Sequence, residues 1–284
     1  MPFSSVVKAL IPIAKKEHSS LPLQSVFGVD GTPVPLVQHL VAELLEAGIE
    51  EVCLVVNAGS HALVFPVLEP FSRRVRYVWQ DEPKGFGHAL WCAREWVGSD
   101  PVLVQVCDHL FLQSEEVSCV RQMIEAWGAR GSSICGIQRI REVEVPHVGV
   151  VSGKRVDKES QLYLLDSFLE KPSLTKAELL PHIQGLGSNE YFCSAGIFVL
   201  SPTFFDILQD FSVKCSVEDL RWLAPALMEL MRRESVYGQE IEGRRINLEE
   251  RFGLLRAQVA MGLASSHRDA VSTVMLEEAL RGRR

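Results

Sequence analysis

The sequence predicts an α/β fold in which a mixed, mostly parallel sheet is flanked by helices. Over roughly the first 140 residues, short apolar runs rich in β-branched residues alternate with segments whose apolar residues recur at helical spacing. Such alternation is typical of parallel strands joined by crossover helices. After Arg139 the pattern changes to short paired strands, which predicts a β-rich lobe grown onto the same sheet.

Local signals place the elements of the first part. Strands are expected at residues 6–14, 51–57, 76–80, 101–107 and 132–138, and helices at 33–47, 60–71, 86–97 and 114–127. Thr32 followed by Pro33 predicts a helix N-cap with proline at the first helical position, and Gly48 is typical of a helix end. Pro66 is expected to shorten or kink the second helix.

The second part is expected to begin with a β-hairpin or meander at residues 148–151 and 161–169. Further helices are expected at 201–211, 218–233, 248–264 and 273–281, and short strands at 236–241 and 245–247. The sequence has no low-complexity linker and no internal repeat. Residues 1–284 are therefore predicted to form a single domain, with parts at 1–140 and 141–264 and a C-terminal helix within 265–284.

Composition excludes several classes of protein. The net charge of −7 disfavours a nucleic-acid-binding protein, which needs a basic face. No apolar run approaches the length of a membrane span, and the N-terminal segment lacks the features of a signal peptide. The seven cysteines are scattered and include no C-x-x-C pair, which argues for a reducing compartment and against a zinc site. We therefore expect a cytoplasmic protein without nucleic-acid or membrane partners.

The most informative motif runs from Gln80 to Ala89 (QDEPKGFGHA), between an apolar strand and a helical pattern. Gly85 and Gly87 would let a ligand approach backbone N–H groups closely. The Gln80 amide can donate to and accept from the edge of a nucleotide base at the same time. The alternative is a turn that uses glycine only for its geometry, but such a turn would need neither Gln80 nor His88.

Polar residues also follow other predicted strands. Ligands of parallel α/β sheets bind beyond the carboxyl ends of the strands, so Lys15, Gln80 and Asp108 should line one crevice. Asp108 is a candidate Mg²⁺ ligand beside phosphates, although an aspartate that caps the next turn is the alternative. In Glu170-Lys171-Pro172, the carboxylate can accept sugar hydroxyls and the ammonium can pair with phosphate. The alternative there is a strand-end turn with two solvated charges.

Taken in order, these segments resemble the sugar-nucleotide pyrophosphorylases, above all the bacterial UTP–glucose-1-phosphate uridylyltransferases. The resemblance extends from about residue 8 to residue 263 and implies a Rossmann-like fold of the nucleotide-sugar transferase type. It implies that residues 1–140 bind the nucleotide and residues 141–264 the sugar. The site residues that it implies are Gln80, Gly85, Gly87 and His88 for the nucleotide, Gly149, Glu170, Lys171 and Gly196 for the sugar, Asp108 and Lys171 for catalysis, and Asp108 with Asn247 for Mg²⁺.

The sequence departs from the family pattern at two places. The family has a glycine-rich phosphate loop after its first strand, where this chain reads Lys15 to Ser20 (KKEHSS). Near the C-terminus, Asn247 takes the position of a metal-binding aspartate, and an amide is a weaker Mg²⁺ ligand than a carboxylate. Lys15 or Lys16 could pair with phosphates instead, and Glu249 or Glu250 could reach a metal.

Two hypotheses about function follow. The first is a divergent sugar-1-phosphate nucleotidyltransferase that forms a nucleotide sugar and pyrophosphate from a nucleoside triphosphate and a sugar 1-phosphate. The second is a catalytically inactive relative that binds nucleotide or nucleotide sugar as a regulatory or partner subunit, because the base and sugar residues are kept whereas the triphosphate and metal residues are not. A homo-oligomer, or a complex with an active paralogue, is among the assemblies expected.

Overall fold

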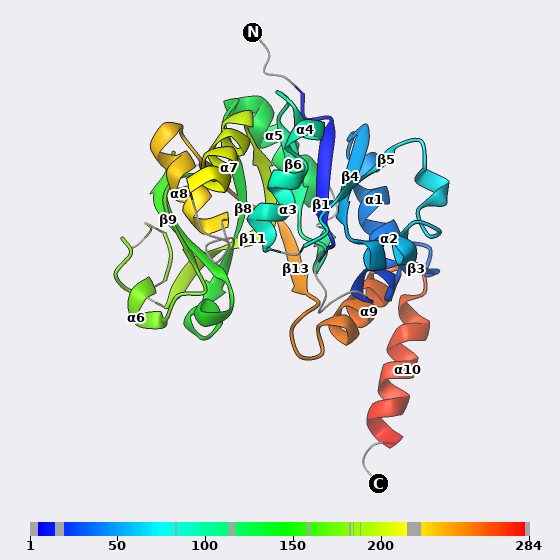
Figure 1. The fold of residues 1–284 in the computed structure, drawn as a ribbon. Helices are drawn as coiled ribbons and strands as arrows, with labels where there is room; N and C mark the ends of the chain where they lie inside the picture. The colour runs from blue at the N-terminus through cyan, green and yellow to red at the C-terminus, as the bar shows by residue number, and fades with distance from the viewer. Residues whose placement is uncertain are drawn as a thin grey trace.

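A computed structural model describes residues 5–14, 20–82, 84–113, 117–157, 160–181, 183, 185–187, 189–214 and 223–281 (Figure 1). Within these residues the main sheet has nine strands in the order β5-β4-β1-β6-β11-β8-β12-β10-β9. In that order the strands are Val75–Trp79, Glu51–Val56, Lys8–Pro12, Val102–Gln105, Glu190–Leu200, Ile134–Arg141, Tyr237–Glu240, Leu162–Glu170 and Gly149–Arg155.

The sheet is mixed, as predicted, and its two halves differ. Strands β5, β4, β1 and β6 are parallel neighbours, so their carboxyl ends lie at one edge. Strand β11 then pairs antiparallel with both β6 and β8, and β9 and β10 form the predicted hairpin. Parallel pairing recurs only between β8 and β12 among the other described strand pairs. The parallel half is therefore the half with the predicted crossover helices.

Helices cover both faces of the sheet (Figure 1). Because side chains of a strand alternate between faces, Ala9 and Ile11 of β1 pack into one core and Leu10 into the other. The first core includes residues of α1 (Leu36–Glu46), α2 (Ala58–Val64), α5 (Cys119–Arg130) and α9 (Gly253–Ala264). The second includes residues of α3 (Phe86–Cys92), α4 (Arg94–Val97), α7 (Pro202–Lys214) and α8 (Leu223–Arg233).

The predicted start of the first helix is wrong. Residues 33–35 form strand β3 (Pro33–Pro35), which pairs with β2 (Ser25–Phe27), and α1 begins only at Leu36. A proline restricts the residue before it to extended backbone, so Pro35 holds Val34 in the strand opposite Val26.

Other boundaries also shift for local reasons. Helix α2 begins at Ala58 because Asn57 and Ser60 form a reciprocal capping box, and it ends before Pro66. The predicted helix at residues 86–97 is divided at Ala93 into α3 and α4. The next predicted helix begins at Cys119, after the N-cap Ser118, and residues 114–116 lie outside the described part of the chain. The last two helices are α9, from Gly253, and α10 (Arg268–Arg281).

Three further features were not predicted. Strand β11 occupies the middle of the sheet, and β7 (His109–Gln113) pairs antiparallel with β13 (Gly243–Asn247) beside it. Helix α6 (Leu174–Ala177) closes the outer end of the β9–β10 lobe (Figure 1). In the described residues, no helix combines the length and the apolar character required of a membrane span.

Candidate functional site

The carboxyl edge of the parallel strands brings several predicted site residues to one side of the sheet. Gln80 directly follows β5, and Asp108 follows β6 within a short turn. Strands β4 and β1 lie between them, so three strand spacings, or roughly 14 Å, separate the two strand ends. This span suits a ligand longer than a single sugar ring.

Gln80 lies in a polar cluster at the start of α3. Its side chain is 3% exposed, and its Nε2 donates to Nδ1 of His88 at 2.7 Å and to the carbonyl oxygen of Gly85 at 3.4 Å. Burial, with Lys84 nearby, lowers the pKa of His88 below its usual range, which favours the neutral ring that can accept at Nδ1. Gly85 has a φ of 112°, a conformation that favours glycine. These contacts hold the Gln80 amide in one orientation.

Asp108 and Asn247 lie side by side through the β7–β13 pair. Asn247 pairs with His109, and the backbone N–H of Leu248 donates to the carbonyl oxygen of Asp108 at 2.8 Å. The Oδ1 atom of Asp108 is buried and has no hydrogen-bond partner among the described residues. By contrast, Oδ1 of Asn247 accepts the backbone N–H of Glu249 at 3.0 Å. Asp108 therefore has a carboxylate oxygen that no described group satisfies, whereas the oxygen of the Asn247 amide already stabilises a turn.

Gly196 sits in a bulge of β11 directly beside this pair. The register of β11 with β8 shifts between Ser194 and Phe198, and Gly196 has a φ of 79°. A Cβ atom at Gly196 would collide with the His109 ring and with Val106. The sequence predicted a glycine of the sugar site here; the structure adds a reason for glycine that needs no ligand.

His109 is a positioning residue that the sequence analysis did not include. Its Nδ1 donates to the carbonyl oxygen of Ala195 at 2.9 Å, which ties β7 to the bulge of β11. Burial, with the nearby charge of Arg245, lowers the pKa of His109 to about 4, so the ring is neutral at neutral pH. The only signal in the sequence was its place directly after Asp108.

Gly149, Glu170 and Lys171 meet at the end of the β9–β10 hairpin. Gly149 pairs with Glu170, and the backbone N–H of Lys171 donates to the carbonyl oxygen of Val148 at 3.1 Å. The neighbouring pair of Val150 with Cys193 places this end close to the bulge of β11. Strand pairing thus carries these three residues toward the edge at which Asp108 lies.

The charges at this end have distinct environments. Burial raises the pKa of Glu170, and the nearby ammonium of Lys171 opposes part of that rise. Lys171 itself has a φ of 44°, in the left-handed region that side-chain-bearing residues rarely adopt. Strained backbone of this kind is frequent at ligand sites, because the surrounding structure must hold it.

The donor set at the edge is compatible with Mg²⁺ but not with a closed metal cage. The described residues contain no cluster of three His, Cys, Asp or Glu side chains arranged to hold a metal ion. Mg²⁺ commonly binds through one or two carboxylates together with waters and substrate phosphates. The unpartnered Oδ1 of Asp108 fits that mode. Residues 15–19, where the resemblance would place a phosphate loop, lie outside the described residues.

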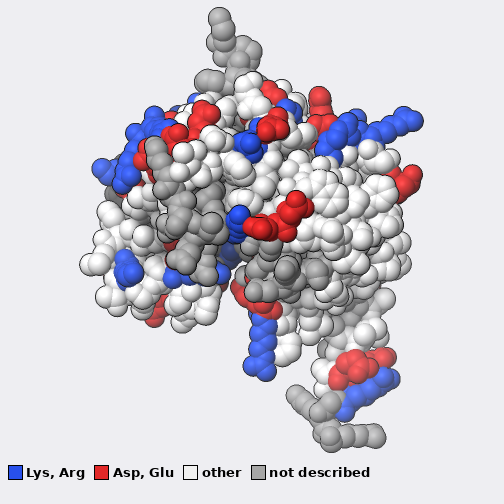
Figure 2. Space-filling model, viewed as in Figure 1, with Lys and Arg blue, Asp and Glu red and all other residues white. Residues whose placement is uncertain are grey.

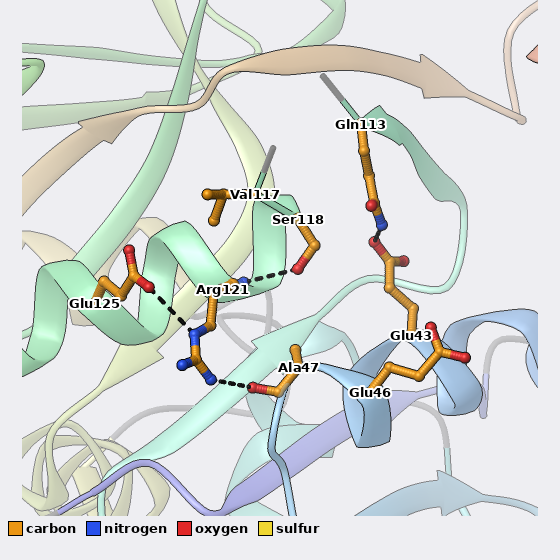
Figure 3. A pocket seen from close by; sticks show the side chains of 8 residues that line it. All are labelled: Glu43, Glu46, Ala47, Gln113, Val117, Ser118, Arg121 and Glu125. Carbon is orange, nitrogen blue, oxygen red and sulfur yellow. Dashed lines mark hydrogen bonds and ion pairs between the residues drawn. The ribbon is translucent and has the colours of Figure 1, made fainter. Parts of the chain in front are cut away.

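A separate polar pocket lies between α1 and α5, on another part of the molecule (Figure 3). Nε2 of Gln113 donates to Oε1 of Glu43 at 3.0 Å, and Nη1 of Arg121 donates to the carbonyl oxygen of Ala47 at 3.2 Å. Burial is the main reason that the pKa of Glu43 rises to about 7. None of the residues predicted from the sequence as site residues lines this pocket.

Comparison with known proteins identifies relatives along most of the chain. A model of the nucleotidyl transferase family matches residues 18–239. A UTP–glucose-1-phosphate uridylyltransferase of Bacillus subtilis is 27% identical over 276 residues, which cover 88% of this chain and 89% of that protein. UTP–glucose-1-phosphate uridylyltransferase 1 of Staphylococcus saprophyticus is 25% identical over 288 residues, which cover 92% of this chain and 94% of that protein.

Solved structures share the fold. A UDP-glucose pyrophosphorylase crystallised with UDP-glucose superposes with a TM-score of 0.71 at 23% identity, covering 90% of this chain and 98% of that one. The UTP-bound UGPase of Acinetobacter baumannii superposes with a TM-score of 0.74 at 21% identity, covering 96% and 99% of the two chains. This chain therefore shares its overall fold with these solved structures.

Proposed function

The chain belongs to the nucleotidyl transferase family, and we propose that it is a sugar-1-phosphate uridylyltransferase that uses UTP and glucose 1-phosphate. The observation that carries this proposal is the buried Oδ1 of Asp108, which has no partner among the described residues and lies at the carboxyl edge of the sheet. A buried carboxylate oxygen without a partner is costly unless a ligand satisfies it. The similar uridylyltransferases are named for this pair of substrates.

In this proposal the nucleotide lies at the carboxyl ends of the parallel strands β5, β4, β1 and β6. Oε1 of Gln80, whose Nε2 is held by His88 and Gly85, accepts from the base, and Gly85 and Gly87 allow the nucleotide to approach the backbone. Glu170, whose carboxylate is partly buried, accepts hydroxyls of the sugar. Gly149 and Gly196 let the backbone pack closely beside it, since a Cβ would collide with Phe168 at Gly149 and with His109 at Gly196. Lys171 pairs with the sugar phosphate as a point charge.

The reaction is an in-line displacement at phosphorus. An oxygen of the sugar 1-phosphate forms a bond to the α-phosphorus of UTP, and the bond from that phosphorus to the β-phosphate oxygen breaks, releasing pyrophosphate. Such transfers depend on positioning and on neutralised charge rather than on covalent chemistry by the protein. Lys171 supplies one positive charge, and Asp108 would hold Mg²⁺, with Asn247 beside it. When bound there, Mg²⁺ would offset negative charge on the phosphates.

A second function is favoured by the hydrogen bond and the lack of charge of the Asn247 side chain. Its oxygen accepts the N–H of Glu249, and it carries no charge, so the metal side of the site has one carboxylate where the family pattern has two. A site that keeps its base and sugar contacts but holds Mg²⁺ weakly would bind a nucleotide sugar better than a triphosphate. The chain would then be a binding or partner subunit.

One pair of measurements separates the two functions. Pyrophosphate release is followed with UTP, glucose 1-phosphate and Mg²⁺, using the native chain and Asp108→Asn. The enzyme predicts turnover that falls on the order of 10²–10³-fold in the variant. The binding subunit predicts no turnover, together with calorimetric binding of UDP-glucose that Gln80→Ala weakens. A chain that shows neither turnover nor binding would rule out both functions.

A further inference from the structure

Two contacts fix the side-chain amide of Gln80 in one orientation. Its Nε2 lies 2.7 Å from Nδ1 of His88 and 3.4 Å from the carbonyl oxygen of Gly85. A carbonyl oxygen can only accept, so the amide atom that faces Gly85 must be the nitrogen and not the oxygen. Nδ1 of His88 then accepts from the same nitrogen, which requires a neutral ring with its proton on Nε2. The backbone carbonyl therefore settles both the amide and the ring.

This orientation leaves only the amide oxygen of Gln80 for a ligand. Both hydrogens of Nε2 are taken by His88 and Gly85, whereas Oε1 has no hydrogen-bond partner among the described residues. Gln80 is 3% exposed, and a polar atom in so enclosed a place is costly unless a ligand pairs with it. The sequence predicted an amide that donates and accepts at once. The structure corrects this, because the group that meets the ligand can only accept.

The surroundings of His88 keep its ring neutral. Burial lowers the pKa of His88, Lys84 lowers it further, and Glu82 opposes part of this change. Lys84 and Glu82 pair with each other at 2.9 Å, and acidic side chains lie beside basic ones on the face that carries α3 (Figure 2). Sγ of Cys92 lies 3.8 Å from Nδ1, and burial raises the pKa of this thiol, so it adds no charge. Nδ1 is therefore an acceptor at neutral pH.

Packing restricts rotation of the His88 ring. The ring of Trp91 lies against it, with 5.5 Å between the two centroids. The guanidinium of Arg94 lies 4.1 Å from the centroid of Trp91, and Nε1 of Trp91 donates to Oε1 of Gln209 on α7 at 3.0 Å. Trp91 is thus held from two sides, and it in turn holds the imidazole that orients Gln80.

We propose that His88 is a positioning residue that decides which base the site accepts, because it fixes Gln80 with Oε1 toward the ligand. Uracil completes the contact, since its N3–H donates from between two carbonyl groups. Cytosine has an unprotonated N3 at the same place, so two acceptors would face each other. To avoid this, cytosine would have to shift in the site, or the amide would have to turn and lose its contacts with His88 and Gly85. The inference rests on the proposed binding of a base at Gln80 but not on turnover.

The first test measures binding of UDP and of CDP by calorimetry, which needs no turnover. The native chain is expected to bind UDP more tightly, on the order of 10²-fold, because CDP leaves Oε1 without a donor. In His88→Ala the amide is free to turn, so the ratio of the two affinities should fall to less than about 5-fold. A loss of fold would lower both affinities together and would not change their ratio.

Two further variants show whether acceptance at residue 88 is the cause. His88→Asp is expected to keep the UDP preference, because Oδ1 of aspartate stands as far along the side chain as Nδ1 of histidine and can only accept. An acidic residue also suits this position in the first turn of α3. His61→Ala is the matched control, since His61 packs on Tyr77 at the other face of β5 from α3, and it should keep the native ratio.

The outcomes separate this inference from the function on which it rests. Equal binding of UDP and CDP by the native chain, or an unchanged ratio in His88→Ala, would overturn the role of His88 while a nucleotide site remained. Binding of neither nucleotide would overturn the proposed function and this inference with it.

The second test needs no ligand. Nuclear magnetic resonance of the chain labelled with ¹⁵N-histidine shows which ring nitrogen of His88 carries the proton, and the spectrum of His88→Asp assigns its signals. The expected result at neutral pH is a proton on Nε2 and none on Nδ1. A proton on Nδ1 would overturn the inference, because the ring would then donate to Gln80 and could not hold Nε2 of its amide.

Discussion

Nδ1 of His109 lies 2.9 Å from the carbonyl oxygen of Ala195, and this hydrogen bond joins the strand after Asp108 to the bulge of β11. The carbonyl group can only accept, so Nδ1 carries the proton of the neutral ring. The ring therefore fixes the position of Asp108 relative to Gly196, although neither residue is bonded to the imidazole. A buried histidine here supports the geometry of the site without taking part in chemistry.

Gly196→Ala is expected to destabilise the fold by about 2–3 kcal/mol. The backbone φ of 79° costs a side-chain-bearing residue about 1–2 kcal/mol, and the new methyl group would in addition displace the His109 ring. Chemical denaturation of the native chain and the variant measures the difference.

Gly98→Ala is the matched control for this substitution. Gly98 also has a positive φ, of 63°, but a Cβ there would have no neighbour within 4 Å among the described residues. The Gly98→Ala variant should lose only the free energy of unfolding that the positive φ costs a residue with a side chain. Equal losses at both positions would mean that the His109 ring moves aside without cost.

Lys171→Gly is expected to separate stability from function. Glycine adopts a φ of 44° without strain, so the variant should gain a few tenths to about 1 kcal/mol in its free energy of unfolding. It loses the ammonium group proposed to bind the sugar phosphate, so turnover or sugar-phosphate binding should fall on the order of 10²-fold. Denaturation and a pyrophosphate-release assay, run on the same samples, give both values.

Lys176→Gly serves as the comparison, because Lys176 lies within the short helix α6, where glycine is unfavourable. That variant should lose stability and keep its function. If Lys171→Gly were also less stable than the native chain, the left-handed backbone at this position would not be a source of strain.

Much of the fold could be predicted because local pattern and tertiary packing agree there. Residues 52–56 are apolar and mostly β-branched, and they belong to a strand that is buried on both faces. The motif at Gln80 predicts a strand-to-helix junction, and the structure places it between β5 and α3. The predicted start of the first helix at Pro33 is wrong because residues 33–35 instead form a short strand paired with residues 25–27. This pairing, which places Val34 opposite Val26, cannot be seen in the local sequence pattern.

The site was less predictable because its geometry depends on pairing between distant residues. Nothing in the sequence indicates that β11 enters between β6 and β8, yet this places Gly196 beside His109. The resemblance predicted Asn247 at the position of a family aspartate, but it could not predict that the Asn247 oxygen accepts a hydrogen bond from the backbone N–H of Glu249. These contacts depend on the register of strand pairing, and a shift of one residue in that register would change which side chains meet.

Asn247→Asp is expected to make the fold respond more strongly to Mg²⁺. A second carboxylate beside Asp108 adds like-charge repulsion when no metal is bound, and it adds a hard anionic ligand when Mg²⁺ binds. Without Mg²⁺ the variant should have a lower melting temperature than the native chain. Addition of Mg²⁺ should raise the melting temperature of the variant by more than that of the native chain. Thermal unfolding with and without millimolar Mg²⁺, which is independent of turnover, measures this change.

Glu249→Gln provides the control, because it removes a charge from the same turn without placing a ligand beside Asp108. Its melting temperature should show no larger Mg²⁺ response than that of the native chain. If Asn247→Asp and Glu249→Gln respond alike, Asp108 and residue 247 do not share a metal.

The buried carboxyl group of Glu43 makes stability depend on pH. Glu43 is 5% exposed, Gln113 donates to its Oε1, and Oε2 has no partner among the described residues. Its pKa of about 7 in the folded state lies above the ordinary value of 4.5. Between these two values the folded chain binds more protons than the unfolded chain, so the free energy of unfolding falls as pH rises. The contribution of Glu43 is complete below about pH 4.5 and is lost by about pH 7.

Glu43→Gln should remove this dependence. The amide has the same shape, keeps an oxygen that can accept from Gln113, and has no charge to bury. At pH 8 the variant should be more stable than the native chain by up to about 3 kcal/mol, whereas at pH 4.5 the two should be nearly equal. Denaturant titrations at both pH values measure the four free energies, and His109, which titrates near pH 4 in both chains, cancels in the comparison. Equal stability at pH 8 would mean that the ionised Glu43 is compensated within the fold.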